Sequence, residues 1–153
     1  MNYFYLICND GYDANNSDQP VSAFDICMKR LEEKKWPLYR NTQGIQKIKN
    51  DSQFLIYLAG KNKYSQHFVA SFITDKIIEG FDMHYDNFNQ SYLQSVIKEY
   101  IQIKEIKIFE QPFSVKSKMN ELDFIKNKDK YGIYFQGGLK SISEQEFKKI
   151  NDK

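Results

Sequence analysis

Several residue types that support specialised chemistry are scarce in this chain of 153 residues. It contains two cysteines, two histidines and one tryptophan. Neither histidine has a partner at a metal-ligand spacing such as H-E-x-x-H or C-x-x-C, and motifs such as G-x-G-x-x-G and G-x-S-x-G are missing. We therefore expect no metal site, no cofactor and no catalytic residues.

Long apolar runs are also missing, since no stretch approaches the ~18 residues that a membrane helix requires. The N-terminal residues lack the basic segment and apolar stretch of a secretory signal. Cys8 in a strand pattern and Cys27 in a helix pattern read as reduced core thiols. These features predict a cytoplasmic protein without a membrane partner.

Aromatic residues, by contrast, are abundant, with 11 Tyr and 12 Phe beside the single Trp. Hydrophobic residues make up 41% and charged residues 27%, as in a globular protein, and the length predicts one domain over residues 1–153. The net charge of +2 permits a nucleic-acid partner without requiring one. The aromatic excess suggests that some rings face a ligand.

The order of apolar patterns predicts an α+β fold with a strongly curved mixed sheet or small barrel, flanked by short helices. The expected strands are 3–8, covered on both faces, a hairpin of 54–59 and 68–74, then 100–109 and 131–135. Ser22 and Ser143 are expected to cap helices. The polar segment 9–20 and the segment 75–95 are predicted to be loops.

The apolar phase of the fourth expected strand changes halfway along it. Ile101 and Ile103 are odd-numbered, whereas Ile106 and Ile108 are even-numbered. A β-bulge near Lys104-Glu105 would restore the register.

Trp36 stands between the charged end of the first helix and Pro37. Because a residue before proline is pushed into extended geometry, we expect this tryptophan not to be a core residue but to form the wall of a pocket. The alternative is that the indole plugs one end of the barrel.

The order of these segments resembles an EVE domain, a member of the PUA-like group to which YTH domains also belong. The resemblance covers nearly the whole chain. Two departures are Ala70, where a glycine is common, and Lys140, where an arginine is frequent. The segments that carry it are 3–8 running into Asn9-Asp10, Trp36, 45–48, 54–57, 68–73, 112–116, 122–125, Tyr131-Gly132 and 137–143.

This resemblance implies binding of a modified nucleobase in an aromatic pocket, either flipped from a DNA duplex or presented on a single strand. Aromatic faces would stack on the base, amides would read its edge, and basic residues would hold the flanking phosphates. The expected pocket residues are Trp36, Tyr39, Tyr57, Ser71, Tyr85, Asn9 and Asn41. The expected phosphate-binding residues are Lys34, Lys35, Arg40, Lys116 and Lys118, provided that the two groups share a face.

Each of these residues also has an ordinary structural interpretation. Strand packing would account for Tyr57 and Ser71, turn formation for the two asparagines, and a solvated face for the later lysines.

The function that this resemblance implies is the reading of a modified base in DNA, in a modification-dependent restriction or defence system. The chain has no nuclease or motor motif, so a separately encoded nuclease or motor subunit would supply any cleavage. The alternatives are a reader of methylated RNA or tRNA, a protein-interaction module with an aromatic docking patch, and a small hydrolase, which would need a nucleophile and a base in contact within a cleft. Asp82, His84 and Asp86 could supply acid and base groups, but no nucleophile is identified beside them.

Overall fold

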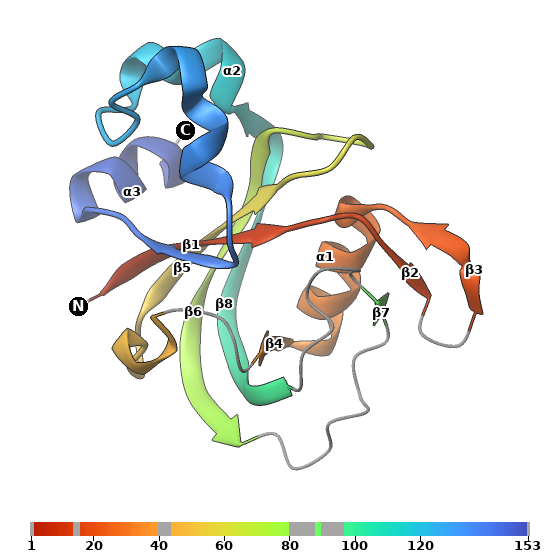
Figure 1. The fold of residues 1–153 in the computed structure, drawn as a ribbon. Helices are drawn as coiled ribbons and strands as arrows, with labels where there is room; N and C mark the ends of the chain where they lie inside the picture. Colours follow the sequence, from red (N-terminus) through yellow and green to blue (C-terminus); the bar gives the residue numbers. More distant parts are fainter. Residues whose placement is uncertain (1, 14–15, 40–43, 80–87, 90–96, 153) are drawn as a thin grey trace.

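The computed structural model describes residues 2–13, 16–39, 44–79, 88–89 and 97–152 (Figure 1). None of the helices in these ranges is long and apolar enough to cross a membrane. The strands are β1 (Tyr3–Cys8), β2 (Gly11–Asp13), β3 (Asn16–Val21), β4 (Lys35–Tyr39), β5 (Gln53–Leu58), β6 (His67–Glu79), β7 (Phe88–Asn89), β8 (Ile97–Ser114) and β9 (Leu139–Ser141). The helices are α1 (Ala23–Glu33), η1 (Ile45–Lys47), α2 (Val115–Lys118), η2 (Met119–Glu121), η3 (Lys128–Phe135) and α3 (Glu144–Asn151), where η denotes a 3₁₀-helix.

Six strands form one curled sheet in the order β4-β8-β6-β5-β1-β9. The β1 and β5 strands are parallel, and the other neighbours are antiparallel. Figure 1 shows β6 and β8 as long strands that bend together along the sheet. The predicted α+β fold with a strongly curved mixed sheet is confirmed.

The predicted bulge in β8 is also present. Ser71 pairs with Lys107 and Ile73 with Lys104, so β8 contributes one residue more than β6 across this interval. Glu105 takes up the extra length with a φ of 50°. The bulge brings Ile106 against the same core as Ile103, although the two differ in parity.

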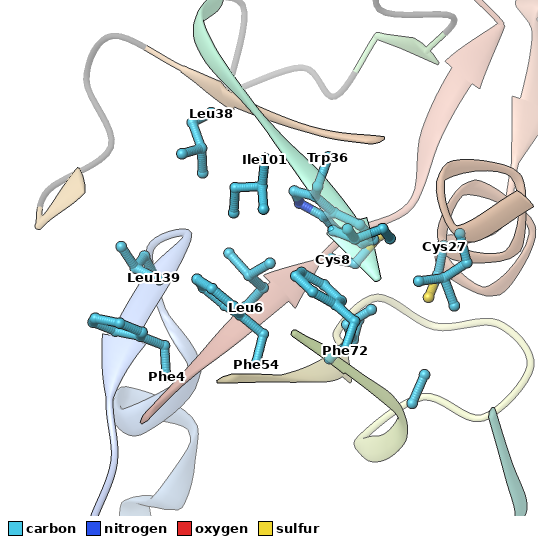
Figure 2. Packing of buried hydrophobic residues seen from close by; sticks show 14 of the residues in the cluster. Phe4, Leu6, Cys8, Cys27, Trp36, Leu38, Phe54, Phe72, Ile101 and Leu139 are labelled. Carbon is cyan, nitrogen blue, oxygen red and sulfur yellow. The ribbon is translucent and has the colours of Figure 1, made fainter. Parts of the chain in front are cut away.

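Two hydrophobic cores lie on the two faces of this sheet, because successive residues of a strand point to opposite faces. Phe4, Leu6 and Cys8 of β1 belong to the core beneath α1, which we call the α1-face core (Figure 2). Tyr5 and Ile7 belong to the core that includes Phe147 and Ile150 of α3, which we call the α3-face core. The prediction that this strand is covered on both faces is confirmed.

Both predicted helix caps are present. The Oγ of Ser22 accepts from the Asp25 N–H at 3.1 Å, and the Oγ of Ser143 accepts from the Glu146 N–H at 3.2 Å. The Glu146 side chain does not complete the box. It accepts instead from the Phe124 N–H at 2.9 Å, which ties α3 to the segment before η3.

Three sequence predictions of secondary structure are wrong. The expected loop 9–20 contains β2 and β3, which join β7 in a small sheet made largely of polar residues. The expected loop 75–95 begins too early, because pairing with β8 keeps β6 extended through Glu79. The expected strand 131–135 lies in η3: its Tyr and Phe content resembles a strand, but Tyr131, Tyr134 and Phe135 pack as helix side chains on the α3-face core.

Candidate nucleic-acid interface

Trp36 lies in β4, and its side chain is 3% exposed within the α1-face core. Its indole packs near Phe72 of β6, with ring centroids 6.3 Å apart (Figure 2). The expectation that a tryptophan before proline is not a core residue is therefore wrong. The extended geometry that Pro37 imposes suits a strand, and β4 is an edge strand, where a missing N–H is tolerated.

A buried arginine accompanies this tryptophan. Arg30 of α1 is 5% exposed, and its guanidinium carbon lies 4.9 Å from the centre of the Trp36 ring. Such a cation–π contact is worth up to about 2 kcal/mol when water is excluded. Arg30 is the only buried cation among the described residues, and it was missed because its position in the helix pattern looked like an ordinary charged one.

The structure does not bring Tyr57 and Ser71 to Trp36. Tyr57 of β5 belongs to the α3-face core, where its ring stacks on Phe135 at a centroid distance of 4.0 Å. Ser71 of β6 donates its Oγ–H to Asn151 Oδ1 of α3 at 2.6 Å. Both side chains therefore lie on the face opposite Trp36, and the expectation that they floor a pocket shared with the indole is wrong.

A cavity does open beside Tyr57. It has a volume of about 350 Å³ and lies between the end of β5, the β5–β6 hairpin and η3. Tyr131 donates its hydroxyl to Gln66 Oε1 at 2.8 Å on the cavity wall. Burial, with a smaller contribution from Tyr131, raises the pKa of Tyr57 well above its usual value, so this phenol stays neutral at physiological pH.

The remaining expected pocket residues are scattered. Tyr39 is 8% exposed and packs with Ile97 and Tyr100 in a separate small cluster. Asn9 is half-buried just after β1. Asn41 and Tyr85 lie outside the described residues.

The expected phosphate-binding residues do not form one track. Lys35 pairs with Gln102 near one end of β8, whereas Lys116 and Lys118 follow its other end, about 40 Å away along the strand. Lys34 caps α1 with a φ of 56°, and Arg40 lies outside the described residues. In Figure 1, β4 and α2 stand at opposite ends of β8. The condition for a single track, that the two groups lie together, is therefore not met by Lys35 and the lysines of α2.

Three other lysines gather along β9, at a place that sequence reasoning did not identify. Lys47 and Lys49 from η1 and the residues after it, together with Lys140 of β9, line two adjoining cavities of about 510 and 390 Å³. These cavities share Phe4, Lys47 and Ser141, so we treat them as one feature and call it the β9 groove. Lys47 and Lys49 gave no signal in the sequence, and Lys140 was noted only because it stands where an arginine is frequent; the pairing of β1 with β9 brings the three lysines to one place.

The described residues contain no group of three or more His, Cys, Asp or Glu side chains that could hold a metal ion. Cys8 and Cys27 are both buried and are not joined in a disulfide, and burial raises the pKa of Cys27 well above its usual value. His67 places Nδ1 2.8 Å from the Ser65 carbonyl oxygen, and His84 lies outside the described residues.

No protein-family model and no curated protein matches the sequence. Solved structures match the fold. Human THYN1, in a complex with DNA containing 5-methylcytosine, aligns with a TM-score of 0.62 and 11% identity over 98% of this chain and 95% of that chain. Protein Atu2648 from Agrobacterium tumefaciens aligns with a TM-score of 0.56 and 12% identity over 98% of this chain and 90% of that chain. The N-terminal domain of Staphylothermus marinus McrB aligns with a TM-score of 0.49 and 9% identity over 97% of this chain and 92% of that chain.

At such low identity these similarities establish the fold alone. The alignments with THYN1 and Atu2648 extend over nearly all of each chain, so the shared architecture is a whole fold rather than a local motif. The resemblance to EVE domains is confirmed at the level of the fold.

Proposed function

We propose that this chain binds nucleic acid and recognises a modified base in DNA, in a modification-dependent restriction or defence system. The observation that carries the proposal is the likeness of fold, over 98% of the chain, to a protein solved with DNA that contains 5-methylcytosine. The proposed activity is binding alone. A separately encoded nuclease or motor subunit would supply cleavage.

We further propose that the base binds on the α1 face, at the end of β4. Trp36 is buried there beside a fixed cation, Arg30, and the chain continues from β4 into residues 40–43, which include Asn41. Stacking of a base on an aromatic face is worth about 1–3 kcal/mol. In this proposal Asn41 reads the base edge and Tyr85 forms the wall on which the base stacks, while Trp36, 3% exposed, supports the site from within the α1-face core.

The Tyr57 cavity is the competing location on the opposite face. Its volume of about 350 Å³ and its tyrosine and phenylalanine lining are compatible with a planar ring. The two locations are on different faces of one sheet, so a substitution at one leaves the other unaltered. This makes them separable by experiment.

The test is a titration of the full chain with matched fluorescent oligonucleotides. Duplex and single-stranded DNA and RNA would carry cytosine or adenine, with and without modification. We expect DNA with a modified base to bind at least tenfold more tightly than its unmodified counterpart, about 1.4 kcal/mol. Equal binding to all oligonucleotides would overturn the proposal and favour a protein-interaction module, whereas selective binding of methylated RNA would favour the RNA reader.

The substitution that locates the site must preserve the core. Trp36→Phe keeps an apolar ring in the α1-face core while altering the packing that supports the proposed site, and we expect it to lower the preference for the modified base. Tyr131→Phe is the matched control, because it removes only the hydroxyl that bonds Gln66 at the Tyr57 cavity. Loss of preference in Tyr131→Phe alone would move the site to the α3 face.

A further inference from the structure

The β9 groove, made of two cavities that share lining residues, lies at one edge of the six-stranded sheet. It runs between η1, the start of β1 and the turn from β9 into α3. One hydrogen bond holds η1 against this edge, since Asn2 donates its side-chain amide to the Lys47 carbonyl at 2.9 Å. Gly44, just before η1, and Leu139 of β9 line the groove together. Figure 1 shows η1 beside the N-terminal end of β1. The groove is therefore built from fixed secondary structure.

Three cationic side chains in this groove lack acidic partners. Lys47 and Lys49 are exposed and Lys140 is half-buried, and none of them forms an ion pair with another residue in the described ranges. Other lysines of the chain are neutralised: Lys104 pairs with Asp51 at 2.9 Å, for example. Ammonium groups gathered in one groove without carboxylates produce a local positive potential.

Among the described residues that line the groove, Glu144 is the acidic one, and it is already engaged. Glu144 accepts from the Lys148 ammonium at 3.1 Å and from the Tyr3 hydroxyl at 3.0 Å. These two hydrogen bonds, that of Lys148 first, hold the pKa of Glu144 below its usual value. Lys148 therefore largely neutralises the Glu144 carboxylate, so this carboxylate does little to offset the positive charge of the three groove lysines.

Hydroxyl groups lie beside these cations. Ser141 and Ser143 are both exposed and line the groove. Ser143 uses its Oγ lone pair to accept from the Glu146 N–H, which leaves its own proton available for donation. Lysine ammonium and serine hydroxyl groups are among the donors that proteins use for phosphate oxygens of a nucleic-acid backbone, and such contacts carry no sequence information.

From these observations we infer that the β9 groove binds the phosphate backbone of the DNA whose modified base the domain recognises. The inference rests on the proposed function. It assigns Lys47, Lys49 and Lys140 as the phosphate contacts, in place of the lysines near α2. It also fits the chain path, since η1 follows β4 after residues 40–43 and so comes directly after the proposed base-binding segment.

The test is the salt dependence of DNA binding by the triple variant Lys47→Ala/Lys49→Ala/Lys140→Ala. Each phosphate contact contributes about 0.9 to the slope of log K against log salt on duplex DNA. Three lost contacts should lower this slope by about 2–3 and weaken binding at low salt at least tenfold, equally for modified and unmodified DNA. The matched control is Lys61→Ala/Lys116→Ala/Lys118→Ala, which removes the same charge elsewhere.

The outcomes separate this inference from the proposed function. A lower slope in the groove variant, with the control unchanged, supports the groove as the backbone site. Equal salt slopes in both variants, or a larger loss of slope in the control, would overturn the inference about the groove. The proposed function would still stand in that case if the wild-type protein preferred DNA with the modified base. Wild-type protein without any such preference would overturn the proposed function, whatever the slopes.

Discussion

The turn after β5 offers a sharp test of the packing described above. Gly60 has a φ of 91°, and a methyl group added to it would lie 2.3 Å from Asp10 Oδ2. Asp10 has little freedom to retreat. Its Oδ1 accepts from the Ala23 N–H at 2.8 Å, and its Oδ2 accepts from the Lys61 N–H at 2.9 Å, so one carboxylate joins the start of α1 to the β5–β6 hairpin.

Gly60→Ala should therefore be destabilising for two separate reasons. A side chain at positive φ costs about 1–2 kcal/mol. Displacing the Asp10 carboxylate costs a further ~1.5–3 kcal/mol for each charged hydrogen bond that is lost. If one of the two Asp10 hydrogen bonds is lost, the two costs together predict a loss of about 2.5–5 kcal/mol in the free energy of unfolding, measured by urea denaturation. The typical total is about 5–15 kcal/mol.

Two other glycines and one double variant separate the cost of the positive φ from the cost of displacing the Asp10 carboxylate. Gly137 has a φ of 86° but no neighbour within 4 Å, so Gly137→Ala should show the backbone cost alone, about 1–2 kcal/mol. Gly132 also has no such neighbour and no positive φ, and Gly132→Ala should change stability by less than about 1 kcal/mol. In an Asp10→Ala background, the cost of Gly60→Ala should fall to that of Gly137→Ala. If Gly60→Ala costs no more than Gly137→Ala in the wild-type background, the reasoning is refuted.

Three further predictions concern packing, capping and pH. Trp36→Ala should lower the free energy of unfolding by about 3–5 kcal/mol, because it empties a buried site, and urea denaturation would show a far smaller loss for Trp36→Phe. Ser143→Ala should cost about 1 kcal/mol by the same assay, because it removes the cap of α3. The Lys149 ammonium, 3.1 Å away, lowers the pKa of Asp123 below its usual 3.8. The folded state thus binds this proton less readily than the unfolded state. The ion pair therefore contributes to the free energy of unfolding above about pH 4, and this contribution is lost as the pH falls through the folded-state pKa of Asp123. Curves of unfolding free energy against pH for Asp123→Asn should lack this fall on the acid side.

Local patterns in the sequence predicted much of the fold. Ser22 and Ser143 were recognised as caps because a hydroxyl three residues before an acidic residue is a local signal. The bulge at Glu105 was recognised because the isoleucine pattern changes parity there. The strand of residues 35–39 was missed, because its pairing partner, residues 97–102 of β8, lies far away in the sequence.

The candidate site was harder to predict because it depends on the face of the sheet. Because side chains alternate between the two faces along β5, Phe54 and Tyr57 are expected to point in opposite directions, and the structure confirms this. Which of them shares a face with Trp36 depends on pairing through β8 and β6, including the bulges between those strands. Choosing Tyr57 by strand without resolving its face therefore assigned it to the wrong pocket.

The β9 groove shows the same dependence on long-range pairing. Lys47 and Lys140 are far apart in the chain, and they become neighbours only because β9 pairs with β1 while η1 packs beside both. The lysines near α2 were more conspicuous in sequence because they are adjacent there. Adjacency in sequence is a poor guide to a phosphate site, since a backbone track needs cations aligned in space.

The burial of Trp36 also changes how binding data on this fold are read. Removing the indole creates a cavity in the α1-face core, so lost binding in Trp36→Ala would report unfolding as readily as a lost binding site. The groove lysines line the edge of the sheet, and truncating them reports backbone affinity with little change in the core. Base preference and salt slope are therefore separate observables that belong to separate parts of the sheet, and a claim about the base requires a variant that changes the first while the protein stays folded.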